Sequence, residues 1–201
     1  MNILFLAAEA APFASTGGLG EVIASLPLAL QTLDANCRVL LPAYQKISQP
    51  CTTLTEWTMD FDGKSISIIL KKAIDTALPL YLLDIPDYFE RDQLYGYEDD
   101  ILRFGAFCRA AIVAQKYFRE HDWEADIIHC HDWHTALFPV YKSTFNAPGK
   151  VLLTIHNLAY QSVCDAAYLS RLGLPDSIFN MHQLEFWGKL NPFKGGLVFA
   201  D

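Results

Sequence analysis

The chain has 201 residues, of which 52% are hydrophobic, and its 15 basic and 23 acidic residues give a formal net charge of -8. This composition excludes a disordered chain, and the acidic excess argues against a nucleic-acid-binding role, because phosphate neutralisation needs clustered Lys and Arg. The length favours one domain with a sizeable core. The longest apolar runs are far too short to span a membrane, and we expect no secretion signal.

The five cysteines are scattered along the chain, odd in number and without a CxxC pair: Cys37, Cys51, Cys108, Cys130 and Cys164. This pattern predicts that most of them are buried reduced thiols, and we therefore expect a cytoplasmic protein.

The first informative segment is an apolar run at residues 3–8 followed by a glycine-rich loop at residues 15–21, Ser-Thr-Gly-Gly-Leu-Gly-Glu. The run predicts a buried strand, and the loop leads into a helix. Glycines allow a close backbone approach, and the free N–H groups of a helix start favour an anion. The segment therefore indicates a phosphorylated or nucleotide-linked ligand. A tight turn without a ligand is the alternative, because the spacing matches neither the dinucleotide fingerprint nor the ATPase phosphate loop.

The next elements alternate between helix and strand. A helix is expected over 20–33, with Pro27 causing a kink or a late start. A strand at 37–41 follows, and Pro42 stops it. The predicted inner face of the helix consists of Val22, Ile23, Leu26, Leu30 and Leu33.

Residues 52–84 show strand patterns with a hairpin signal at Asp62-Gly63. The expected strands are 53–59, 64–71 and 78–83. Beyond them we expect a long helix at 100–119, a strand at 126–130, a helix at 135–141 and a strand at 151–155. Alternating strands and helices predict an α/β fold in which helices cover both faces of a mainly parallel sheet.

Ligands of such sheets bind beyond the carboxyl ends of the strands. The glycine loop, residues 131–134 and residues 156–157 each follow a predicted strand. We therefore expect all three segments to meet at one edge of the sheet.

The run His129-Cys130-His131-Asp132-Trp133-His134 invites a metal interpretation, since neutral imidazoles are good zinc ligands. However, Asp132 stands one place too early for the HxHxDH pattern of dinuclear hydrolases. One alternative has His129 packed within its strand while Asp132 caps the next helix. Another is a polar rim around a sugar or phosphate.

Two further segments offer carbohydrate-binding groups. His156 and Asn157 can exchange hydrogen bonds with sugar hydroxyls. Tyr95 and Tyr97 can stack on a sugar ring, unless residues 95–99 are merely a loop with Asp99 or Asp100 as the helix cap.

The later segment at residues 180–189 mixes aromatic and charged residues, which suits either carbohydrate binding or a seam between domains. The apolar end of the chain leads us to expect that the native protein continues.

Taken together, these motifs resemble the N-terminal half of bacterial glycogen synthases and plant starch synthases. The resemblance covers nearly all 201 residues. It is carried by residues 15–21, 39–42, Tyr95, 103–104, 131–134, 154–161 and 193–197.

The resemblance implies a Rossmann-like three-layer domain over residues 1–201, forming one half of a GT-B-type two-domain glycosyltransferase. It also implies that the C-terminal nucleotide-sugar-binding domain is absent from this chain. The activity implied is retaining transfer of glucose from ADP-glucose to the non-reducing end of an α-1,4-glucan, with no metal or other cofactor. The alternatives are a catalytically impaired glucan-binding scaffold or regulator and, third, a metallohydrolase.

The resemblance also assigns roles to particular residues. His156 and Asp132 are the expected catalytic residues. The donor is expected to contact Ser15, Gly17, Gly18 and Glu21, and the acceptor glucan Leu19, Tyr95 and Asn157. The chain departs from the family at two of these positions, because the loop usually begins with Lys where Ser15 stands and usually carries Asp where Glu21 stands.

Overall fold

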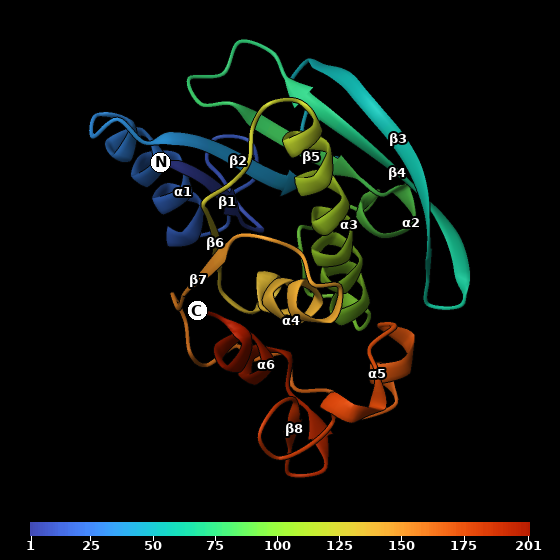
Figure 1. The fold of residues 1–201 in the computed structure, drawn as a ribbon. Helices are drawn as coiled ribbons and strands as arrows, with labels where there is room; N and C mark the ends of the chain where they lie inside the picture. The colour runs from blue at the N-terminus through green and yellow to red at the C-terminus, as the bar shows by residue number, and fades with distance from the viewer.

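The computed structural model describes all 201 residues and is built around one seven-stranded sheet with the strand order β3-β4-β5-β2-β1-β6-β7 (Figure 1). Five neighbouring strands are parallel, β5-β2-β1-β6-β7, whereas β4 runs antiparallel to both of its neighbours. The strands are β1 (Asn2–Leu6), β2 (Asn36–Pro42), β3 (Cys51–Phe61), β4 (Lys64–Ala73), β5 (Leu80–Asp84), β6 (Ile127–His131) and β7 (Lys150–Thr154). The predicted mainly parallel α/β sheet is confirmed.

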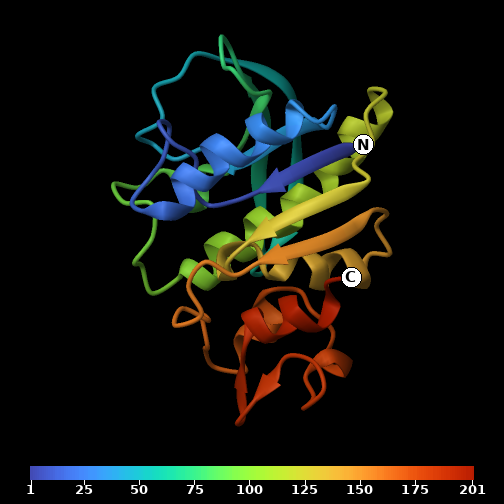
Figure 2. The same ribbon diagram turned by 90° about the vertical axis from the view of Figure 1, so that its left-hand side faces the viewer.

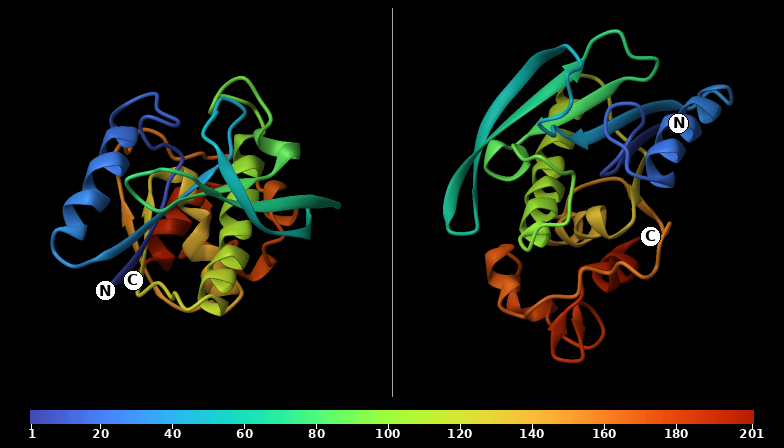
Figure 3. Two further views of the ribbon diagram at one scale, coloured as in Figure 1. Left: turned by 90° about the horizontal axis from the view of Figure 1, so that it is seen from above. Right: turned by 180° about the vertical axis from the view of Figure 1, so that it is seen from behind.

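Helices cover both faces of the sheet. Helix α1 (Gly18–Gln31) packs on the face formed by Ile3 and Phe5 of β1. The opposite face, with Leu4 and Leu6, packs against α3 (Asp100–Glu120) and α4 (Leu137–Thr144). The alternation of side chains along β1 thus separates two apolar cores, and the result is a three-layer arrangement (Figures 2 and 3).

The β3–β4 hairpin turns where the sequence indicates it. Asp62 and Gly63 both have positive φ angles, 52° and 73°. That pair of conformations is typical of a two-residue hairpin turn, and Asp and Gly adopt it at low cost.

Two helices differ in detail from the prediction. Helix α1 begins early, at Gly18, with Pro27 buried inside it, so a late start is wrong. Leu33 lies beyond the end of the helix and is 75% exposed, so it does not belong to the inner face. The helix expected at 135–141 is divided into a short 3₁₀ turn at Trp133–Thr135 and α4.

The remaining elements are short. Helix α2 (Pro86–Phe89) precedes α3, and the last forty residues hold α5 (Tyr168–Arg171), a 3₁₀ turn (Asp176–Ile178), the two-stranded β8 (Glu185–Phe186) and β9 (Lys189–Leu190), and α6 (Pro192–Phe199). The five cysteines are free, and Cys37, Cys108 and Cys130 are buried. None of the helices combines the length and the apolar character needed to cross a membrane.

Candidate active site

A cavity of about 690 Å³ lies at the carboxyl edge of the parallel strands, where Figure 2 shows the arrowheads of β1, β6 and β7 pointing the same way. Its walls come from the glycine loop, the loop before α3, the β6–α4 turn and the loop after β7. The lining residues are Glu9, Thr16, Gly17, Gly18, Leu19, Val22, Tyr95, Gly96, Asp100, Asp132, Trp133, His134, His156, Asn157 and Tyr160. The three predicted segments do meet at one edge.

The buried carboxylate of Glu9 organises the glycine loop. Glu9 is 2% exposed and accepts hydrogen bonds from the backbone N–H of Thr16 at 2.7 Å and of Gly17 at 3.3 Å. It also accepts from the Thr16 hydroxyl at 3.0 Å and from the Tyr95 hydroxyl at 2.5 Å. A buried carboxylate with this many donors is well satisfied, so Glu9 holds the loop and the Tyr95 wall in one arrangement.

Glu9 was not among the residues predicted from the sequence. The available signal was a carboxylate between Ala8 and Ala10, directly after a buried strand. Glutamate is rarely fully buried unless it is paired, so this position called for a partner.

The two glycines at the start of α1 face open space. An added Cβ at Gly17 or Gly18 would have no protein atom within 4 Å, and neither residue has a positive φ angle. The fold itself therefore does not require glycine here. Their effect is to leave the N–H groups of the first helical turn uncovered beside the cavity, as close approach of an anion requires.

Tyr95 forms the opposite wall. Its ring lies against His134, with centroids 5.0 Å apart, and its hydroxyl donates to Glu9 and lies beside the Thr16 hydroxyl. Burial, followed by the hydrogen bond to the Glu9 carboxylate, raises the pKa of Tyr95 to about 12. The hydroxyl therefore stays protonated at neutral pH.

Asp132 acts on the loop after β7. Its Oδ1 atom accepts from the backbone N–H of His156 at 2.7 Å and of Asn157 at 3.2 Å. Its side chain makes no capping bond to the following helical turn, so the capping interpretation is wrong. Asp132 instead fixes the path of the backbone that presents His156 and Asn157.

Three histidines, His129, His131 and His156, lie ring against ring and lead from β6 to the wall of the cavity. His129 bonds the Thr154 hydroxyl at 2.7 Å, and its ring lies 4.1 Å from that of His131. His131 in turn bonds His156 at 2.9 Å. The prediction that His129 packs within its strand is confirmed, since only 7% of it is exposed.

Burial keeps the imidazoles of His129, His131 and His134 neutral. Desolvation is the largest cause in each case and lowers the pKa of His129 to about 4, of His131 to about 2 and of His134 to about 3. Coulombic repulsion from neighbouring histidines, or from Arg103 at His134, adds to the effect.

This arrangement predicts acid sensitivity. The unfolded chain holds these histidines near pKa 6.5, so between the folded and unfolded values it binds more protons than the native state. Stability is therefore fully present above about pH 6.5 and is lost as the pH falls. We expect the free energy of unfolding to drop by about 3 kcal/mol between pH 7 and 5.5, roughly 1 kcal/mol per histidine.

Urea titrations of the chain at each pH measure this slope. His134→Phe is expected to remove about a third of it, whereas His121→Ala, at an exposed histidine, is the matched control that keeps it. A flat profile in the wild-type chain would mean that the buried histidines are not kept neutral.

Two predicted donor residues do not line the cavity. The Ser15 hydroxyl points back to the carbonyl oxygen of Gly17 at 3.4 Å, and its side chain occupies the space beside Gly20. Glu21 is exposed on α1. The other predicted residues, Gly17, Gly18, Leu19, Tyr95, Asp132, His156 and Asn157, lie together around the cavity.

No group of three or more His, Cys, Asp and Glu side chains is arranged to hold a metal ion. Within the segment 129–134, His131 is occupied by its bond to His156 and Asp132 by backbone N–H groups. The geometry therefore offers no support for the metallohydrolase alternative.

The aromatic segment at 180–189 lies elsewhere. Its second half belongs to the β8–β9 hairpin, seen away from the sheet in Figure 1, and Trp187 at the turn is 88% exposed. None of its residues lines the cavity.

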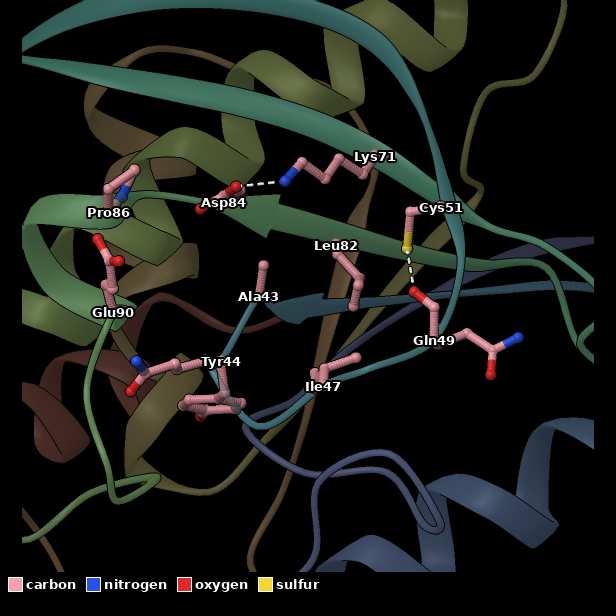
Figure 4. A pocket seen from close by; sticks show the side chains of 11 residues that line it. Ala43, Tyr44, Ile47, Gln49, Cys51, Lys71, Leu82, Asp84, Pro86 and Glu90 are labelled. Atoms are coloured by element: carbon pink, nitrogen blue, oxygen red, sulfur yellow. Dashed lines mark hydrogen bonds and ion pairs between the residues drawn. The ribbon is translucent and has the colours of Figure 1, made fainter.

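A second cavity, of about 340 Å³, lies between the loop after β2 and the strands β4 and β5 (Figure 4). Two of its charged groups pair with each other, because Lys71 lies 2.5 Å from Asp84. The thiol of Cys51 donates to the carbonyl oxygen of Gln49 at 3.2 Å. None of the residues predicted to be functional lines it, whereas seven of them line the cavity of about 690 Å³, which is therefore the candidate active site.

Comparison with known proteins agrees with this geometry. The family model described as the starch synthase catalytic domain matches residues 2–201. Glycogen synthase 2 of Geobacter sulfurreducens is 37% identical over 221 aligned positions, and the glycogen synthase of Koribacter versatilis is 39% identical over 216. Each alignment covers 100% of this chain and 44% of the relative, so the chain spans less than half the length of these relatives.

Among solved structures, the catalytic domain of starch synthase IV from Arabidopsis thaliana, bound to ADP and acarbose, superposes with a TM-score of 0.86 at 31% identity. The match covers 98% of this chain and 43% of the plant protein. The fold is thus the Rossmann-like, mainly parallel α/β architecture found in a GT-B starch synthase, and the chain belongs to the starch synthase catalytic domain family of glycosyltransferases.

Proposed function

We propose that the complete protein transfers glucose from ADP-glucose to the non-reducing end of an α-1,4-glucan with retention of configuration. The observation that carries the proposal is the glycine loop, which leaves the N–H groups of the α1 start uncovered beside a cavity rimmed by His156, Asn157 and Tyr95. A helix start suits the donor phosphates, and the rim offers hydrogen bonds and an aromatic face to sugars.

The solved starch synthase that this chain resembles binds ADP and acarbose, a nucleotide and a saccharide. In the proposal, Gly17 and Gly18 lie against the donor phosphates and sugar, and His156 lies against the donor glucose. Leu19, Tyr95 and Asn157 face the acceptor. Asp132 acts as a positioning residue through the His156 loop, because its Oδ1 atom is taken up by backbone N–H groups. No metal or other cofactor takes part.

The proposal further assigns the facing wall of the cleft to a C-terminal domain that binds the nucleotide sugar. Transfer needs groups positioned from both sides of a closed cleft from which water is excluded. The test is to incubate the complete protein with radiolabelled ADP-glucose and glycogen, with UDP-glucose in parallel. Label that an α-1,4-specific amylase releases from the glycogen would support the proposal. Glycogen binding without transfer would favour the scaffold alternative.

The 201-residue chain by itself is expected to show no measurable transfer in the same assay, because it supplies only one wall of the proposed cleft. The complete protein is the control. Incorporation by the chain alone at a comparable rate would contradict the two-walled site.

Gly18→Ala is expected to separate binding from folding. Alanine in a helix is favoured over glycine by up to about 1 kcal/mol, and no protein atom lies within 4 Å of the new Cβ, so the stability should hold or rise. The methyl group would nevertheless stand between the helix start and the donor phosphate. We expect ADP to bind at least about tenfold more weakly, equivalent to about 1.4 kcal/mol.

Calorimetric titration of the complete protein with ADP, beside thermal unfolding, measures both effects. Ala24→Gly, also on α1 but away from the cavity, is the matched control that should lower stability and leave ADP affinity unchanged. Unchanged ADP affinity in Gly18→Ala would place the phosphates elsewhere.

A further inference from the structure

His131 touches the candidate active site only through another residue. It is fully buried and does not line the cavity, yet its Nδ1 atom lies 2.9 Å from Nε2 of His156, which does line it. The two rings are stacked, with centroids 5.2 Å apart and planes at 26°. This bond joins the end of β6 to the exposed loop after β7.

The position of His131 is closely determined. Its backbone N–H donates to the Thr135 hydroxyl at 2.7 Å, and that hydroxyl donates back to the His131 carbonyl oxygen at 2.9 Å. The ring lies against His129 on the same strand and against Phe5 of β1, whose centroid is 5.9 Å away. Because the His131 ring is packed on several sides, its orientation is fixed. The orientation and tautomer of His156 must therefore match those of His131.

The hydrogen between Nδ1 of His131 and Nε2 of His156 can be bonded to either nitrogen. If His156 donated from Nε2, neutral His131 would carry its own hydrogen on Nε2. That atom is buried and has no hydrogen-bond partner. If His131 donates from Nδ1, only a lone pair of Nε2 is left without a partner. An orphaned buried N–H is the rarer and costlier state. Burial, which lowers the pKa of His131 to about 2, excludes a doubly protonated ring that would donate from both nitrogens.

We propose that His131 donates from Nδ1 to Nε2 of His156 and thereby holds His156 in the tautomer that carries its hydrogen on Nδ1. The Nε2 lone pair of His156 is then engaged by the fold, and its Nδ1–H is the group left to meet a ligand. His156 therefore acts as a hydrogen-bond donor to a ligand oxygen, not as a base. His131 is a positioning residue.

The assignment to a sugar oxygen rests on the proposed glucosyl transfer, whereas the tautomer itself does not. The first test is accordingly independent of activity. Long-range proton–nitrogen correlation spectra of the nitrogen-15-labelled chain, recorded at about pH 8, distinguish the two neutral tautomers of each histidine. We expect protonated Nδ1 and bare Nε2 for His156. A protonated Nε2 would overturn the proposal.

Two variants extend the test. His131→Phe keeps a ring in the stack and removes the donor, so the Nε2–H form of His156 should become populated. His131→Asn places an amide N–H near the lost Nδ1 and should restore the wild-type tautomer. His129→Phe, the neighbouring ring that bonds Thr154 and not His156, is the matched control and should leave the tautomer unchanged. An unchanged His156 spectrum in His131→Phe would overturn the proposal, and the wild-type spectrum decides it if that variant does not fold.

Kinetics of the complete protein test the consequence. His131→Phe should lower kcat about 10- to 100-fold with little change in KM, and His131→Asn should recover most of it. Transfer at the wild-type rate by His131→Phe would overturn the positioning role. Absence of transfer by the wild-type protein would instead refute the proposed function, while the spectra still decide the tautomer.

Discussion

Glu9→Ala is expected to lower the activity of the complete protein strongly and to destabilise the domain. Removing the carboxylate leaves the N–H groups of Thr16 and Gly17 and the hydroxyls of Thr16 and Tyr95 without their acceptor. Each hydrogen bond to a charged group contributes about 1.5–3 kcal/mol, although exposed members of the set regain water. We expect a loss of about 3 kcal/mol in the free energy of unfolding. Since the loop would no longer be fixed, we also expect at least a 10²-fold fall in kcat/KM.

Urea unfolding and transfer kinetics measure the two losses. Tyr95→Phe is the matched control, because it removes one of the four donors and leaves the glycine loop bonded to Glu9. We expect it to cost about 1.5 kcal/mol in stability, clearly less than Glu9→Ala. A Glu9→Ala variant with wild-type turnover would show that the loop does not depend on this carboxylate.

His156→Ala is expected to reduce kcat of the complete protein about 10²- to 10³-fold, the effect of losing one preorganised hydrogen-bond donor at a reacting centre. The acceptor KM should change much less, because the proposed function places the acceptor against Leu19, Tyr95 and Asn157. The backbone N–H of His156 and its bond to Asp132 survive the substitution, so the loop should keep its path. Asn157→Ala, the next residue on the same loop, is the matched comparison and should raise the acceptor KM instead.

Steady-state kinetics with varied glycogen and fixed ADP-glucose separate the two patterns. A change confined to acceptor affinity in His156→Ala would move His156 to the acceptor side of the site. The same result would mean that the Nδ1–H group of His156 does not contact the donor glucose. The tautomer of His156 would still be decided by the spectra.

Local patterns in the sequence determined most of the fold. Residues 3–8, 37–41 and 126–130 are mainly apolar segments of strand length, and each is followed by a turn or helix signal. Because side chains alternate across a strand and helices follow strands in turn, these patterns suffice for a parallel sheet covered on both faces. They also place the carboxyl ends of the strands at one edge, which is why Gly17, Asp132 and His156 were expected together.

The partners of each polar group, in contrast, were decided only by the tertiary structure. Glu9 meets Tyr95, 86 residues away, and Asp132 meets the backbone of His156, 24 residues away. A capping role for Asp132 is the local expectation, but here a bond to a neighbouring strand's loop replaces it. Sequence spacing reports which residues reach an edge of the sheet. It does not report hydrogen-bond pairing, because that depends on angstrom-scale distances between elements far apart in the chain.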